Sequence, residues 1–89
     1  MSAILMSEVL EFSLPPVPKF VLYLLADGIN CDGEYWPKDG VLERKTGCSS
    51  DELSQALQWL GEVGLIRILR RGGAIGYRLT FGRSVGGEE

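Results

Sequence analysis

The chain has 89 residues, of which 45% are hydrophobic and 24% are charged, and its net charge is −3. These values are typical of one small folded domain, and they exclude a disordered chain and a membrane protein, which needs roughly 18 consecutive apolar residues. Residues 67 to 83 hold five arginines and no acid, whereas residues 1 to 66 hold four cations and ten carboxylates. Such a split indicates either an oriented electrostatic surface or only a solvated face.

Residues 1 to 14 form an apolar N-terminal segment. The segment lacks the basic start and the cleavage site of a signal peptide, so we expect it to be retained in a cytoplasmic protein. Its large side chains fit a helical stripe from Ile4 to Phe12, but they also alternate as in a strand from Leu10 to Leu14. Because an uncovered apolar patch usually marks an interface, we expect either a homodimer contact or packing onto the same domain.

A helix is expected within LPPVPKFVLYLLADG, residues 14 to 28, because prolines are tolerated at a helix start and a glycine often ends one. One face of this helix would consist of Phe20, Val21, Leu24 and Leu25. The next residues, INCDGEYWP, are rich in turn formers and predict a loop whose two aromatic residues pack against the core.

The same loop bears on metal binding. Asn30, Asp32 and Glu34 loosely resemble a calcium loop, but the spacing and the downstream bidentate glutamate are absent. Cys31 and Cys48 lie 17 positions apart in a chain with no CxxC motif and no histidine, which favours two reduced thiols over a zinc site. We expect no metal and no cofactor. The chain also lacks a phosphate-binding glycine loop with lysine and a nucleophile with a candidate base, so we expect no enzyme.

Two further helices are expected, from about Lys38 to Thr46 and after Ser49, with a turn at Gly47 between them. The second helix has apolar residues at i, i+3, i+4 and i+7 and ends near Gly64. These apolar residues are Leu53, Ala56, Leu57 and Leu60. Ser49 and Glu52 have the S-x-x-E spacing of a capping box. Two helices joined in this way have the spacing of a helix-turn-helix motif.

The runs LIRILR and AIGYRLTF flank the triplet RGG and predict a β-hairpin. In the second run large residues alternate with small or polar ones, which indicates one buried and one solvated face. The large residues are Ile75, Tyr77, Leu79 and Phe81. Trp59 lies at the edge of the preceding helix stripe, and we expect it to pack against the hairpin. Residues 84 to 89 are expected to be a flexible acidic tail.

Residues 15 to 81 resemble the winged helix-turn-helix domains of phage and plasmid replication initiators and of related phage regulators. The resemblance lies in the order and spacing of LLADG, DGEYWP, GVLERKTG, CSSDELSQALQWL, GLIRIL and RRGGAIGYRL. It implies an α+β winged helix-turn-helix fold over residues 15 to 83, with a three-helix core and a C-terminal two-stranded β-wing. It also implies binding of double-stranded DNA by a transcriptional regulator or a replication accessory protein.

In that family the helix after the capping serine enters the major groove, and the wing contacts the adjacent backbone. The resemblance therefore implies a reading face of Ser50, Asp51, Ser54, Gln55 and Gln58. Arginines on the wing would contact phosphate, because a guanidinium group offers a planar fork to phosphate oxygens. The alternative is that they are only the polar face of an exposed hairpin and pair with the protein's own acids. These wing residues are Arg67, Arg70, Arg71 and Arg78.

Two positions depart from the family pattern. Basic residues usually follow the capping serine, where this chain has Asp51 and Glu52, and a small residue usually stands at the position of Glu43. The two acids have a structural explanation, since Glu52 completes the capping box and Asp51 suits the helix dipole. Asp51 would nevertheless repel a phosphate at the helix start. A second function therefore stays open: a winged-helix module that binds a protein partner, or a small acidic inhibitor of a nucleic-acid-binding protein.

Overall fold

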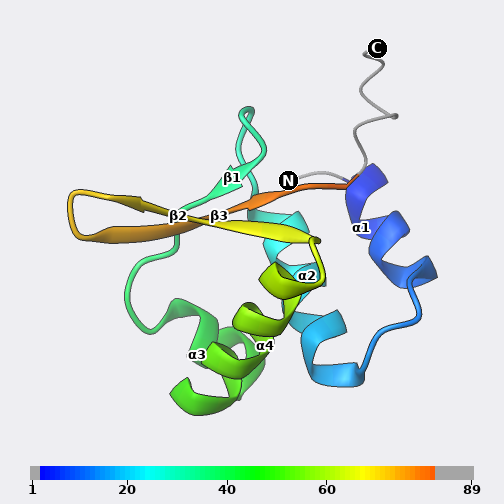
Figure 1. Ribbon diagram of the computed structural model, residues 1–89, viewed down its shortest axis with the longest axis horizontal. Coiled ribbons are helices and arrows are strands. Elements are labelled where there is room, and N and C mark those ends of the chain that lie inside the picture. The colour runs from blue at the N-terminus through cyan, green and yellow to red at the C-terminus, as the bar shows by residue number, and fades with distance from the viewer. Residues whose placement is uncertain (1–2, 82–89) are drawn as a thin grey trace.

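The computed structural model describes residues 3–81, which form four helices and a three-stranded antiparallel sheet (Figure 1). The elements are α1 (Ala3–Glu11), α2 (Pro16–Gly28), β1 (Glu34–Tyr35), α3 (Val41–Thr46), α4 (Ser50–Glu62), β2 (Ile66–Arg71) and β3 (Ala74–Leu79). The fold class is α+β, as predicted, but these residues contain one helix and one strand more than the expected three-helix core and two-stranded wing. None of the described helices is long and apolar enough to cross a membrane.

Helix α2 begins with prolines in its first turn, where a missing backbone N–H costs no helical hydrogen bond. Its buried residues are Val21, Leu22, Leu25 and Ala26. This face differs from the predicted one, because Phe20 is 44% exposed and Leu24 is only half-buried. The helix has large apolar residues on several sides, so its buried face depends on the helices that pack against it, α1 and α4.

The N-terminal segment is helical, so the alternative of a strand is wrong. Helix α1 packs against α2, and Val9 is completely buried in the shared core. Phe12 makes an edge-to-face contact with Phe81, with 5.1 Å between the ring centroids. The segment therefore packs onto the same domain, although Ile4 and Leu10 stay exposed. The expected acidic tail at 84 to 89 lies outside the described residues.

A left-handed glycine, Gly47, separates α3 from α4, with a φ of 75°. Helix α3 starts at Val41, later than predicted, because Gly40 just before it is also left-handed. Helix α4 has the predicted capping box: Ser49 Oγ accepts from the Glu52 N–H (3.1 Å), and the Glu52 carboxylate accepts from the Ser49 N–H (2.9 Å). The predicted apolar stripe is confirmed, and its buried residues are Leu53, Ala56, Leu57 and Leu60.

The sheet has the strand order β1-β3-β2, so the second strand of the hairpin is central. Gly72 and Gly73 both have a positive φ and join β2 to β3 in a two-residue turn, which matches the natural twist of a hairpin. Strand β1, expected as loop, pairs with β3 through Glu34 and Arg78. The predicted two-stranded wing is therefore wrong, since the sheet has three strands. The sequence did not indicate β1, because a strand of two residues is too short to show an alternation pattern.

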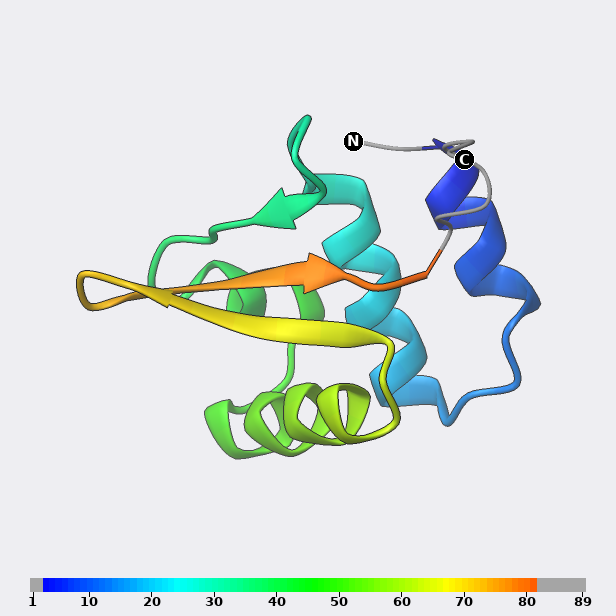
Figure 2. The same cartoon turned by 45° about the horizontal axis from the view of Figure 1, so that its top comes forward.

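The hairpin extends past the helices (Figure 2). The predicted alternation of buried residues on β3 holds near the base, where Leu79 is buried and Tyr77 is half-buried. Towards the turn it fails, since Ile75 is 43% exposed and Ile68, on the neighbouring strand, is 39% exposed. The end of the hairpin thus lies beyond the core, and its apolar side chains are only partly covered.

Candidate nucleic-acid interface

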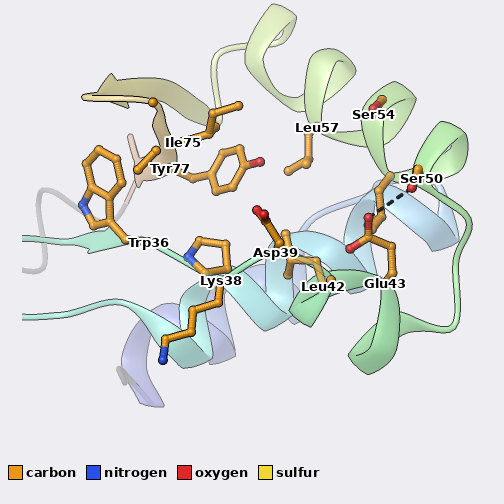
Figure 3. Close-up of a pocket in the computed structure, with 15 residues that line it drawn as sticks. Trp36, Lys38, Asp39, Leu42, Glu43, Ser50, Ser54, Leu57, Ile75 and Tyr77 are labelled. Atoms are coloured by element: carbon orange, nitrogen blue, oxygen red, sulfur yellow. Dashed lines mark hydrogen bonds between the residues drawn. The ribbon is translucent and has the colours of Figure 1, made fainter.

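All nine residues expected to contact DNA are solvent-exposed, five on α4 and four on the hairpin. They do not share one surface. Ser50 and Ser54 line a cleft between α4 and the hairpin (Figure 3). Gln55 lines a separate groove on the other flank of α4, next to the start of α2. Trp59 lines that second groove as well, with Pro18, and it packs against the core. The apolar stripe of α4 has two edges, and its spacing does not say which edge faces the hairpin.

The polar side of α4 is acidic, because its 13 residues, SDELSQALQWLGE, include three acids and no cation. Two of the expected base-reading side chains already have partners within the protein. Ser50 Oγ donates to Glu43 Oε2 (3.1 Å), which gives a role to the glutamate that departs from the family pattern. Gln58 Nε2 donates to Glu62 Oε2 (3.4 Å). The first turn of α4 therefore presents Asp51 rather than a cation to an approaching ligand.

The cleft between α4 and the hairpin has a volume of about 710 Å³. Leu42, Leu53 and Leu57 give it an apolar lining, and Tyr77 faces Leu57 across it (Figure 3). Burial raises the pKa of Tyr77, the nearby Glu43 carboxylate raises it further, and Arg70 opposes the rise. The polar residues of the lining are Lys38, Asp39, Glu43, Ser50 and Ser54. The cleft thus combines an apolar surface with more acids than cations.

The strand register divides the four arginines between the two faces of the sheet. Side chains alternate along a strand, so Arg67 and Arg71 lie on one face and Arg70 on the other. Arg78 is directly opposite Arg67 and shares its face, which we call the outer face. Arg70 is opposite Ile75, on the face whose residues nearer the base, Ile66 and Leu79, are buried. The expected wing set therefore consists of three outer-face arginines and one arginine on the opposite face.

Glu34 and Trp36 organise the outer face, a role that the sequence did not suggest. Glu34 is 7% exposed and forms ion pairs with Arg78 and, at 3.9 Å, with Arg71. Trp36 Nε1 donates to Glu34 Oε1 (3.0 Å). The guanidinium carbon of Arg71 lies 4.6 Å from the centroid of the Trp36 ring, a cation–π contact. Hydrogen bonds from Trp36 and then from Arg78 hold the pKa of Glu34 below its ordinary value.

The loop that loosely resembles a calcium site is closed by its own hydrogen bonds. Asn30 Oδ1 accepts from the backbone N–H groups of Asp32 (2.9 Å) and Glu34 (3.1 Å). Within residues 3–81, no three His, Cys, Asp or Glu side chains are grouped so that they could hold a metal ion. Cys31 and Cys48 are free thiols.

The chain has no significant match to a protein family model, a curated protein or a solved structure.

Proposed function

We propose that the chain is a winged-helix DNA-binding protein of phage or mobile-element type, which acts in the cytoplasm as a transcriptional regulator or a replication accessory protein. One observation supports this function best. All nine side chains implied by the resemblance are solvent-exposed, on α4 and on the hairpin that follows it. None of them is buried in the core, although they divide between the two flanks of α4 and the two faces of the hairpin.

In this proposal the hairpin supplies most of the affinity. Arg67 and Arg70 are exposed, and the ion pairs found among the described residues do not involve them. Their guanidinium groups are available to phosphate oxygens, which dominate DNA affinity. Helix α4 would contribute discrimination between bases, since Asp51 can accept from cytosine N4 and Gln55 can pair with adenine.

A titration with random-sequence duplex DNA over a series of salt concentrations tests this function. Each lost phosphate contact lowers the slope of log Kd against log salt by about 0.9. For the double variant Arg67→Gln/Arg70→Gln we therefore expect weaker binding and a flatter salt dependence than for the wild type. The matched control is Arg44→Gln/Lys45→Gln, which removes the same charge from exposed positions on α3.

The control separates two kinds of electrostatic binding. Equal losses in both double variants would assign the affinity to overall charge and not to the hairpin. If the wild type has no salt-sensitive affinity for any duplex at low salt, DNA binding is refuted.

A protein partner is the second candidate, and the cleft beside α4 favours it. The apolar lining of the cleft adjoins the acids Asp39 and Glu43. A partner segment with both basic and apolar side chains would complement this surface. The chain would then be a protein-interaction module or an acidic inhibitor of a nucleic-acid-binding protein. A wild type that does not bind duplex DNA, together with an Asp51→Arg variant that does, would favour this function.

We also propose a homodimer, which is compatible with either function. Helix α1 leaves Ile4 and Leu10 each 57% exposed, although its other large apolar residues contact the core. Light scattering on the full chain and on a Leu10→Lys variant tests the contact. A wild type that is monomeric at about tens of micromolar would exclude it, because dimer formation depends on concentration.

A further inference from the structure

Trp36 forms a platform near the turn of the β2–β3 hairpin. One face of its indole ring lies against Gly76 of β3, where an added Cβ would come within 2.7 Å of indole Cε2. Arg71 stacks on the ring and directly precedes the turn. The indole N–H donates to the carboxylate of Glu34, and this hydrogen bond fixes the orientation of the ring.

Arg71 contacts both Trp36 and Glu34 and is still accessible. Its side chain is 73% exposed, although the guanidinium group stacks on an indole and lies within ion-pair distance of Glu34. A guanidinium group has five N–H donors, and those directed away from Glu34 remain free for a ligand. An arginine that is already ordered loses less side-chain entropy when it binds an anion than one that is free to rotate.

We propose that Trp36 is a positioning residue for DNA binding: it holds the guanidinium group of Arg71 at the end of the hairpin, where Arg71 contacts a backbone phosphate. This inference rests on the proposed function and adds to it a residue that lies outside the nine expected contacts. Gly76 contributes to the position of Trp36, because a larger residue there would displace the indole from the strand.

Substitutions that keep the net charge isolate the role of Trp36. Trp36→Leu removes the platform, and Trp36→Phe keeps an aromatic ring beneath the guanidinium group while losing the N–H donor. The readouts are Kd for random-sequence duplex DNA and its salt slope, measured on the full chain, with thermal unfolding to show that each variant is folded. For Trp36→Leu we expect binding about two- to fivefold weaker, the range of an exposed cation–π contact, and a slope lower by up to about 0.9. Trp36→Phe should restore most of both.

A double-mutant cycle shows whether Trp36 acts through Arg71. We expect Arg71→Gln to weaken binding, and the further change Trp36→Leu to have no additional effect in that background. Gly76→Ala provides a second way to displace the indole, should Trp36→Leu fail to fold, and it should weaken binding in the same way. Additive effects of Trp36→Leu and Arg71→Gln would overturn the inference.

The possible failures can be told apart. A folded Trp36→Leu variant with wild-type Kd and salt slope would overturn the positioning role, even if Arg67→Gln/Arg70→Gln still loses affinity as the proposed function requires. A wild type that does not bind duplex DNA would overturn the function and the positioning role together.

Discussion

Helix α4 and the β2–β3 hairpin border the same cleft but carry opposite charges. The helix has three acids and no cation, whereas the hairpin strands have four arginines and no acid. Phosphate contacts dominate DNA affinity, and base contacts determine specificity. In the proposed function the hairpin therefore provides affinity, and α4 provides at most discrimination between sequences.

The two regions also differ in what holds them in place. Helix α4 has a buried apolar stripe and a capping box, both formed by its own residues and the core beneath them. The end of the hairpin lies beyond that core, and Arg71 connects it to Glu34 of β1 and to the ring of Trp36. A change in the core should therefore act strongly on α4, and a change at the end of the hairpin should act weakly on stability.

The largest effect is expected from a truncation beneath α4. Leu60 is completely buried, so Leu60→Ala should lower the free energy of unfolding by about 2 to 5 kcal/mol. The matched control on the hairpin is Ile75→Ala, where the side chain is 43% exposed and the loss should stay below about 1 kcal/mol. A denaturant titration measures both. Similar losses at the two positions would contradict the view that only α4 is secured by the core.

The helix cap should give the next largest effect. Ser49→Ala removes the side-chain acceptor for the Glu52 N–H and should cost about 0.5 to 2 kcal/mol of stability. Ser54→Ala, at an exposed position in the same helix, serves as the control and should have little effect. If the two variants have equal unfolding midpoints in urea, the capping box does not stabilise α4.

Acid should weaken the ion pairs that connect Glu34 of β1 to the hairpin. The pKa of Glu34 in the folded protein lies below its ordinary value of 4.5, because the ionised carboxylate accepts from Trp36 and pairs with Arg78. Its contribution to stability is therefore complete above pH 4.5 and is lost as the pH falls from 4.5 through the lowered pKa. Thermal unfolding of wild type and Glu34→Gln from pH 7 to 2 measures this, and the variant should lose less stability in acid. Parallel curves would exclude a role for Glu34.

Sequence patterns predicted α4 and the turn of the hairpin well, because local spacing determines both. The stripe from Leu53 to Leu60, the capping box and the paired glycines of the turn all depend on residues close together in the chain. Contacts between distant segments were not predictable in this way. Glu34 and Arg78 form an ion pair although they lie 44 positions apart in the chain, and no periodicity in either segment indicates that pairing. For the same reason the buried face of α2 was predicted only in part: Val21 and Leu25 are buried as expected, and packing partners decide the rest of the face.

The sequence names nine candidate contact residues, but it does not say how they are arranged as a surface. All nine side chains are exposed, and their contact with a ligand stays a prediction. Their division among the cleft, the second groove and the outer face depends on the register of β2 and β3 and on the rotation of α4. A single sequence gives the alternation of side chains along each strand. It does not say which face of the sheet the helices cover.

The smallest change in stability, and the sharpest test of the comparison, comes from reversing the charge at the start of α4. Asp51 is exposed in the first helical turn, where a carboxylate favours the helix dipole and repels a phosphate. Asp51→Arg should therefore cost about 0.3 to 1 kcal/mol of stability, and it should strengthen non-specific duplex binding and steepen its salt dependence by about one phosphate contact. Glu62→Arg, at the other end of the same helix, makes an equal change of charge away from the helix start and serves as the control. If Asp51 instead accepts from cytosine N4, the variant will lose discrimination between sites, which a selection from random duplexes would reveal. Equal gains for Asp51→Arg and Glu62→Arg would show that overall charge matters and that the start of α4 does not lie against the phosphate backbone.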